Sequence, residues 1–422
     1  MRLRLPTLSA AALAVLLAST GAPAQLLEER AGSGPRIVLL TLGPGDAIWE
    51  RFGHNAIWVH DPASGTDLAY NYGMFDFQQE SFLLNFIRGR MWYWMEGFDP
   101  YQTVEHYRGR NRSVWMQELN LSPAQGAELR DLLAENALPQ NRFYRYDYYR
   151  DNCSTRVRDA LDRVLGGALR AATDSAPTGT TYRWHTRRLV AEGGGSVPMY
   201  TGLEVGLGPA ADRPISAWEE MFLPVKVRDQ LRRLTVRDPT GAAVPLVRGE
   251  RLLFAATRPP ERQAAPKWWI AGYVVAGLAF AGALLALSAR VRRSGAARWG
   301  FAVLATLWLL VAAAAGWILL GLWTLTDHAI AYRNENLLQL SPLALPLLVL
   351  VPALAFGRRW APRWALPLAL AVAALSLLGA VIQVLPGIDQ ANGEVIALAL
   401  PVNLALAWIV RCLGEETRAG RS

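Results

Sequence analysis

The apolar positions of the chain follow two different patterns, which divide it into two parts. Before about residue 266, apolar and polar residues alternate or recur at helical spacing, whereas from Trp268 onward long apolar runs carry few charges. A helix needs roughly 20 apolar residues to cross a bilayer. Five runs are predicted to be transmembrane helices: 268–288, 299–322, 340–356, 364–385 and 395–410. We therefore predict an all-α membrane domain of about five spans over residues 267–411, followed by a short tail, 412–422.

The first part has the pattern of a mixed α and β domain. Short apolar or alternating runs predict strands at 36–42, 54–60 and 67–72, the last two joined by the turn-rich sequence DPASGT. A helical pattern covers 78–90, and Ser122 followed by Pro123 marks another helix start. The aromatic run 141–152 is interpreted as a strand and the Gly-rich stretch 190–214 as a loop. We predict an α+β fold for residues 25–266.

The sequence YRDNCSTRVRD, residues 149–159, places Cys153 at the start of a predicted helix. Apolar residues then recur at i, i+3, i+4, i+7 and i+8: Val157, Ala160, Leu161, Val164 and Leu165. Asp151 or Asn152 would cap this helix. Free amides and the helix dipole in a first turn favour a thiolate, so we expect a lowered pKa for Cys153. The same amides could donate to a developing oxyanion.

The charges predict how the chain is oriented. Residues 1–24 have the basic start, apolar core and small terminal residues of a secretory signal. Arginines gather in alternate connections between the spans and in the tail, and basic connections stay in the cytoplasm. We therefore expect a multi-pass protein of a bacterial inner membrane whose N-terminal domain lies in the periplasm. The net charge of +8 suits either anionic lipid headgroups or an ordinary arginine-rich surface.

A thiol nucleophile needs a base and an orienting group, and five histidines are available. His54 follows Gly53 at the start of a strand, so a close approach is possible there, and we favour it as the base. Asn71 on the next strand would come near it if the hairpin closes around DPASGT, and Tyr70 or Tyr72 are alternatives.

The other histidines have weaker claims. His60 is interpreted as a turn or surface residue, and His106 and His185 as ordinary surface residues. His328 lies in the polar connection TDHAIAYRNENLLQL, which is either a solvated hairpin, a contact for lipid headgroups or a wall of the site. We predict substrate contacts from four residues: His328, Asn334, Asn336 and Asn152.

Cys153 could also be a small buried residue without chemistry. The second cysteine, Cys412, is expected at the cytoplasmic end of the last span, so the two thiols cannot pair. A lone cysteine in a globular domain is in most cases inert packing, whereas its place at a helix start and the absence of a disulfide partner favour a nucleophile. The residues alone leave these two readings open.

Four stretches resemble a known family. ERFGHNAIWVHDPASGTDLAYNYGMFDF, YRYDYYRDNCSTRVRDAL and RPISAWEEMFLP resemble the Lnb N-terminal periplasmic domain family, and TDHAIAYRNENLLQLSPLAL is similar to the polar loop of its membrane half. The resemblance implies a circularly permuted papain-like (NlpC-type) thiol fold, in which histidine precedes cysteine along the chain. It also implies Cys153 as nucleophile and His54 as base, and an activity in lipoprotein N-acylation.

The expected function is a cysteine-dependent acyltransferase. It would move an acyl chain from a phospholipid, through a Cys153 thioester, to the amine of a lipoprotein. Two alternatives remain: a thiol peptidase or amidase acting on cell-wall peptide, and a membrane-binding protein without catalysis. We expect no cofactor and no metal, because the histidines lack ligand spacing. A nucleic-acid partner is not expected for a domain outside the cytoplasm.

Overall fold

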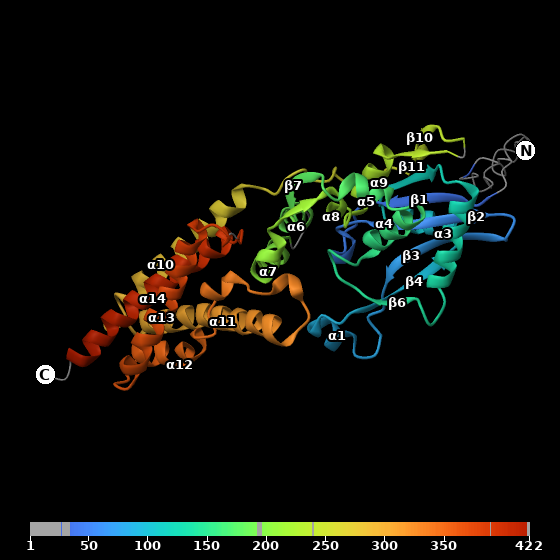
Figure 1. The fold of residues 1–422 in the computed structure, drawn as a ribbon. Coiled ribbons are helices and arrows are strands. Elements are labelled where there is room, and N and C mark those ends of the chain that lie inside the picture. Colours follow the sequence, from blue (N-terminus) through green and yellow to red (C-terminus); the bar gives the residue numbers. More distant parts are fainter. Residues whose placement is uncertain (1–26, 28–33, 192–195, 239, 389, 420–422) are drawn as a thin grey trace, which may run out of the picture.

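The computed structural model describes residues 27, 34–191, 196–238, 240–388 and 390–419. The predicted signal, 1–24, lies outside the described residues. The chain forms two bodies, a sheet domain and a bundle of long helices (Figure 1). Between them lie α6 (Tyr182–Val190), α7 (Ser196–Gly206) and the polar connection after α11.

A seven-stranded antiparallel sheet is the framework of the first body. Its spatial order is β11-β5-β1-β2-β3-β4-β6. The bounds are β1 (Arg36–Leu42), β2 (His54–Asp61), β3 (Thr66–Met74), β4 (Trp92–Phe98), β5 (Val114–Leu119), β6 (Phe143–Arg145) and β11 (Val247–Phe254). The first three strands match the sequence prediction within two residues. Two small sheets pair β7 (Pro177–Thr181) with β8 (Pro214–Ser216) and β9 (Thr235–Arg237) with β10 (Ala243–Pro245).

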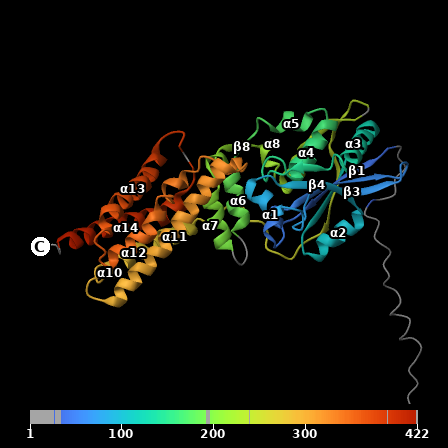
Figure 2. The ribbon, with the colours of Figure 1, turned by 90° about the horizontal axis from the view of Figure 1, so that it is seen from below.

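Both faces of the central strands are buried, which explains why β1 is almost continuously apolar. Ile37 and Leu39 pack with the helices of one face, and Val38 and Leu40 pack with the other side. Successive side chains of a strand point to opposite faces. One face is covered by α3 (Pro123–Asn136), α4 (Cys153–Val164) and α9 (Pro224–Arg233), and the other by α2 (Pro100–Gly109) (Figure 2).

Two stretches for which the sequence analysis predicts no helix form helices. The polar stretch between β4 and β5 forms α2, which starts at the Asp99 cap with Pro100 in its first turn. The Gly-rich stretch predicted as a loop contains α7, whose glycines face open space. The remaining short helices are α1 (Phe82–Arg88), α5 (Ala168–Thr173) and α8 (Ala217–Glu220), and 3₁₀ turns lie at Ile48–Glu50 and Pro209–Ala211.

Four helices of the second body are long and apolar enough to cross a membrane. These candidate spans are Trp269–Ser288, Gly295–Leu325, Ala361–Val384 and Gly393–Thr417. They correspond to α10 (Trp268–Ser288), α11 (Gly295–Leu325), α13 (Ala361–Val381) with the 3₁₀ turn Ile382–Val384, and α14 (Gly393–Ala419). The predicted span 340–356 corresponds to α12 (Ala344–Ala355). Twelve residues reach only about 18 Å, less than the roughly 30 Å apolar core of a bilayer. The count of five spans is therefore not confirmed.

The segment before α12 enters the bundle as a 3₁₀ turn, Glu335–Leu338, followed by irregular backbone. A side chain at Gly316 of α11 would meet the carbonyl oxygen of Leu340 at 2.5 Å and the nitrogen of Pro342 at 2.7 Å. Nearby, Asn403 of α14 accepts from the indole N–H of Trp308 at 3.0 Å and donates to the Gln339 carbonyl at 2.9 Å. Irregular backbone is tolerated at membrane depth only where protein satisfies it.

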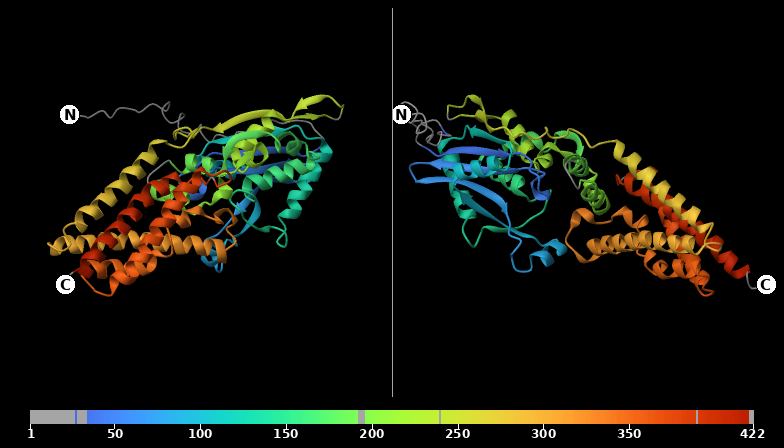
Figure 3. Two further views of the ribbon diagram at one scale, coloured as in Figure 1. Left: turned by 60° about the vertical axis from the view of Figure 1, so that its left-hand side comes forward. Right: turned by 180° about the vertical axis from the view of Figure 1, so that it is seen from behind.

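The polar connection after α11 clamps the two bodies together. Asn334 and Asn336 donate side-chain N–H bonds of 2.9–3.1 Å to the last carbonyl groups of α7. Gln390, before α14, donates to the Leu207 carbonyl at 3.1 Å. The last carbonyls of a helix lack intrahelical partners, and these amides supply them. The clamp holds the sheet domain at one end of the bundle (Figure 3).

Replacing Gly316 with alanine should destabilise the bundle. The added methyl group would collide with backbone, and overpacking of this kind costs about 1–3 kcal/mol. Gly321→Ala is the matched control, because the same helix leaves open space there. Thermal unfolding of the purified protein in detergent should show a lower midpoint for Gly316→Ala alone. Equal midpoints would mean that the irregular segment does not pack against α11 as described.

Candidate functional site

The thiol of Cys153 lies at the first position of α4, held there by the cap residue before it. Asn152 accepts from the backbone N–H groups of Ser154 and Thr155 at 2.8 and 2.9 Å, and donates to the carbonyls of Tyr148 and Phe222 at 2.8 and 3.0 Å. A side-chain amide has two acceptor and two donor positions, and all four are used. Asn152 therefore positions Cys153 and keeps no free group for the substrate contact predicted for it.

The start of α4 approaches the sheet where β3 carries a glycine. Gly73 has φ of +85°, and a side chain there would lie 3.3 Å from Cβ of Cys153 and 3.4 Å from the ring of Tyr146. The nucleophile candidate thus rests against the backbone of β3. His54 is at the first position of the neighbouring strand β2, and Asn55, next to it, directs its backbone N–H to the Cys153 sulfur.

His54 and Asn71 form the pair that the sequence predicts. Nε2 of His54 lies 3.0 Å from Oδ1 of Asn71. The amide of Asn71 is oriented by a second bond, 2.9 Å, from its Nδ2 to the Ala69 carbonyl. Because Oδ1 only accepts, Nε2 must carry the ring proton. Nδ1 then has a free lone pair, as a general base requires.

The electrostatic surroundings favour the neutral forms of both groups. Burial lowers the pKa of His54 to about 4, against the opposing bond to Asn71, and the charge of Arg112 lowers it further. Burial also raises the pKa of Cys153, although Ser154, the Asn55 N–H and Arg112 pull it down. The expected lowering of the thiol pKa at the helix start is therefore wrong, because desolvation outweighs the helix-end effect. At neutral pH the resting site holds a thiol beside a neutral imidazole.

Arg112 is a part of the site that the sequence analysis missed. Its side chain is only 4% exposed, and its Nε donates to the Gly43 carbonyl at 2.7 Å. The guanidinium lies 4.6 Å from the ring of Tyr107, and the same ring lies 6.1 Å from the His54 ring. It pairs with Glu50 at 3.4 Å, while its Nη2 has no hydrogen-bond partner among the described residues. One arginine among many in the sequence carries no local signal of burial.

His60 and His185 lie outside the pair and differ in how far they are buried. His60 lies 3.3 Å from Asp67 on the edge of the hairpin, as a turn or surface residue would. His185 is fully buried, so its interpretation as a surface residue is wrong. Arg188 donates to its Nδ1 at 3.1 Å, and its Nε2 lies 3.0 Å from Glu220. This network joins α6 to α8 and is structural.

The predicted substrate contacts of the polar connection have other partners in the structure. His328 donates through Nε2 to the Phe86 carbonyl at 2.9 Å, and Asn334 and Asn336 cap α7 as described above. These residues hold the domain on the bundle and do not meet Cys153 directly. Their contact with a substrate stays a prediction.

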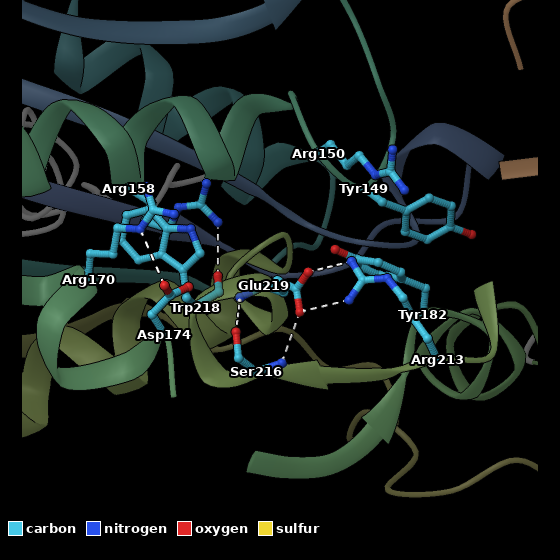
Figure 4. A pocket seen from close by; sticks show the side chains of 10 residues that line it. All are labelled: Tyr149, Arg150, Arg158, Arg170, Asp174, Tyr182, Arg213, Ser216, Trp218 and Glu219. Atoms are coloured by element: carbon cyan, nitrogen blue, oxygen red, sulfur yellow. Dashed lines mark hydrogen bonds and ion pairs between the residues drawn. The ribbon is translucent and has the colours of Figure 1, made fainter. Parts of the chain in front are cut away.

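A cavity of about 360 Å³ lies against another side of α4 (Figure 4). Arg158 lines the cavity. It follows Cys153 by five positions in α4, so its side chain is rotated by about 140° around the helix axis from that of Cys153. Arg158 lies 3.9 Å over the Trp218 ring, and the arginines at 170 and 213 are paired with Asp174 and Glu219. The cavity is a basic pocket whose charges are largely paired within it, and it does not include the thiol.

The pH dependence of Cys153 alkylation should reveal the two electrostatic effects. In a Cys412→Ser background, labelling by iodoacetamide should rise with pH through a pKa above the ordinary thiol value. Arg112→Gln should raise that pKa further, because it removes a positive charge, and should slow labelling at pH 8 several-fold. Arg110→Gln is the control, since Arg110 also pairs with Glu50 but is half exposed. Fast, pH-independent labelling between pH 6 and 8 would contradict a neutral resting pair.

The comparisons with known proteins agree with the predicted family for the sheet domain. Residues 24–193 match the model of the Lnb N-terminal periplasmic domain. No match to this chain was found among curated proteins or solved structures. The permuted papain-like arrangement therefore stays a prediction. The matched segment contains the cysteine, the histidine and the asparagine described above, and four candidate membrane helices follow it. Over residues 24–193 this chain is therefore similar to the Lnb N-terminal periplasmic domain family.

Proposed function

We propose that the protein is a thiol acyltransferase of the bacterial inner membrane, which moves an acyl chain from a phospholipid to the amine of a lipoprotein. The observation that carries the proposal is the His54–Asn71 pair, next in the chain to Asn55, whose backbone N–H is directed to the Cys153 sulfur. This pair lies on a domain fixed to a bundle of apolar helices. The similarity of residues 24–193 to a family of periplasmic domains supports it.

In the first half-reaction, Nδ1 of His54 takes the thiol proton while the Cys153 sulfur attacks the ester carbonyl carbon. The backbone N–H of Cys153, at the first helical position, is left free by the Asn152 cap and can donate to the oxyanion. The carbon–oxygen bond of the ester then breaks, and the imidazolium returns the proton to the leaving alcohol. The products are a lysophospholipid and a Cys153 thioester.

In the second half-reaction, a lipoprotein amine attacks the thioester carbonyl. His54 accepts a proton from the amine, the carbon–sulfur bond breaks, and the thiolate regains the proton. Asn71 keeps the imidazole in one tautomer through both steps. Because the resting thiol and imidazole are both neutral, proton transfer accompanies attack, as in general base catalysis.

The membrane bundle supports a lipid donor over a soluble one. Both a phospholipid and a lipid-modified protein are held in the bilayer, so a site tethered by four apolar helices meets them at high local concentration. A hydrolase of cell-wall peptide would need only a single membrane anchor to stay near its substrate. The clamp between the polar connection and α7 keeps the thiol at a constant distance from the bundle.

The acyl-enzyme should be observable by intact-protein mass spectrometry. Full-length protein incubated with phospholipid and quenched in acid should carry a hydroxylamine-labile acyl mass, and Cys153→Ala should carry none. His54→Ala should slow its formation by roughly 10²–10⁴-fold, the usual contribution of a general base. Asn71→Ala should have a smaller effect, because the imidazole remains.

His60→Ala serves as a matched control, since His60 lies on the same strand but pairs with Asp67. Transfer of the acyl group from wild-type protein to a diacyl lipopeptide with a free amine would complete the cycle. Absence of any adduct, from protein whose Cys153 still reacts with iodoacetamide, would overturn the lipid donor and direct the search to peptides.

A further inference from the structure

The helix α1 presents a row of apolar side chains that nothing in the described protein covers. It has only seven residues, FLLNFIR, and none of them is buried. Leu83 is 69% exposed, Leu84 45%, Phe86 41% and Ile87 54%. Trp49 and Phe77 continue this surface, with ring centroids 5.5 Å apart, and are 56% and 58% exposed. We name these six residues the α1 patch.

The contacts of α1 fix its height relative to the bundle. The backbone N–H of Asp327 donates to the Arg88 carbonyl at 2.8 Å, and Arg90 and Arg145 each reach the Asp327 carboxylate at 2.9 Å. Gly89 allows the backbones to meet, because a side chain there would lie 2.9 Å from His328. The last turn of α1 is thus fastened to the residues that follow α11 (Figures 1 and 3).

That fastening places α1 next to the end of the candidate span α11. Asp327 follows Leu325, the last residue of α11, by two positions, and two residues span at most about 7 Å. The polar interface of a bilayer is about as thick on each side. Leu325 and Trp323 remain exposed at 80% and 42%, as expected for the lipid-facing end of a span. The exposed side chains of α1 therefore lie close to the end of a candidate membrane span.

A row of aromatic rings leads from α1 to the thiol. Phe82 of α1 lies 6.4 Å from Phe75, Phe75 lies 5.2 Å from Tyr93, and Tyr93 lies 4.2 Å from Tyr146. Tyr146 and Cys153 both touch the position of Gly73. The apolar surface at the membrane is therefore continuous with the wall of the candidate site.

We propose that the α1 patch enters the lipid leaflet facing the domain, and that an acyl chain of a glycerophospholipid passes from there along the aromatic row to Cys153. The second clause rests on the proposed acyltransferase function, whereas the first does not. Arg88 lies exposed at the end of α1 without an ion pair among the described residues, where a lipid phosphate can bind it. The patch thus combines an apolar face with a basic end, as interfacial helices do.

The membrane contact can be measured without catalysis. In the full chain with Cys153→Ser and Cys412→Ser, an NBD probe is attached at Leu83→Cys, and at Leu138→Cys as control. Leu138 is 43% exposed and follows α3, a helix on the side of the sheet domain away from the bundle (Figure 1). In vesicles of phosphatidylethanolamine and phosphatidylglycerol, the probe at 83 should shift to the blue and be quenched by doxyl-labelled lipid. Emission and quenching equal to those of the control would overturn the proposal.

The path of the acyl chain needs a second measurement in the otherwise wild-type chain. The double variant Leu83→Asp with Ile87→Asp should lower acylation of Cys153 from vesicle phospholipid at least about tenfold, since two apolar side chains no longer enter the leaflet. Acylation from dibutyryl phosphatidylcholine, dissolved as monomers, should be unchanged, and Leu138→Asp should leave both rates unchanged.

The two failures can be told apart. Equal losses with both donors would show that the variant damages the site itself and would overturn the path. If neither lipid acylates the wild-type protein, the proposed function and the path both fail, while the probe measurement still decides whether α1 enters the membrane.

Discussion

The contact between Cys153 and the backbone of Gly73 is the constraint on which the candidate site depends. Since β3 carries no side chain there, the first turn of α4 can approach the sheet beside the start of β2. His54 begins β2 and Asn71 lies on β3. The hairpin register pairs Ala56 with Asn71, and this register also brings the side chains of His54 and Asn71 together. A larger residue at position 73 would separate the helix from the hairpin and with it the thiol from its base.

The second organising feature is the way in which a membrane protein orients a soluble domain. Helix α7 ends with carbonyl groups that need donors, and the amides of Asn334, Asn336 and Gln390 from the bundle provide them. Buried amide–carbonyl bonds of this kind are directional and costly to leave unmade. Together with the ion pairs of Asp327, they hold the sheet domain and α1 in one orientation above the lipid. The polar residues of that connection therefore fix the sheet domain to the bundle.

The site is electrostatically quiet at rest, which has consequences for its chemistry. A buried thiol and a buried imidazole, both neutral, do not attack water-borne electrophiles as fast as a preformed thiolate does. The charge of Arg112 lowers the pKa of both Cys153 and His54, but burial still keeps the pKa of the thiol above its ordinary value. A substrate that brings its own carbonyl against the thiol would then trigger proton transfer to His54. Such a nucleophile suits an enzyme whose substrate arrives through a lipid-facing path.

The sequence by itself determined the start of α4 and the β2–β3 hairpin, and it offered Asn71 as the partner of His54, with Tyr70 and Tyr72 as alternatives. The cap of α4, the hairpin and the choice of His54 and Asn71 follow from short-range patterns, because caps, turns and strand alternation depend on neighbouring residues. Only the tertiary structure decided the thiol pKa, the burial of Arg112 and His185, the short α12 and the capping roles of Asn334 and Asn336. Each of these depends on contacts between segments far apart in the chain, which the order of residues along it does not reveal.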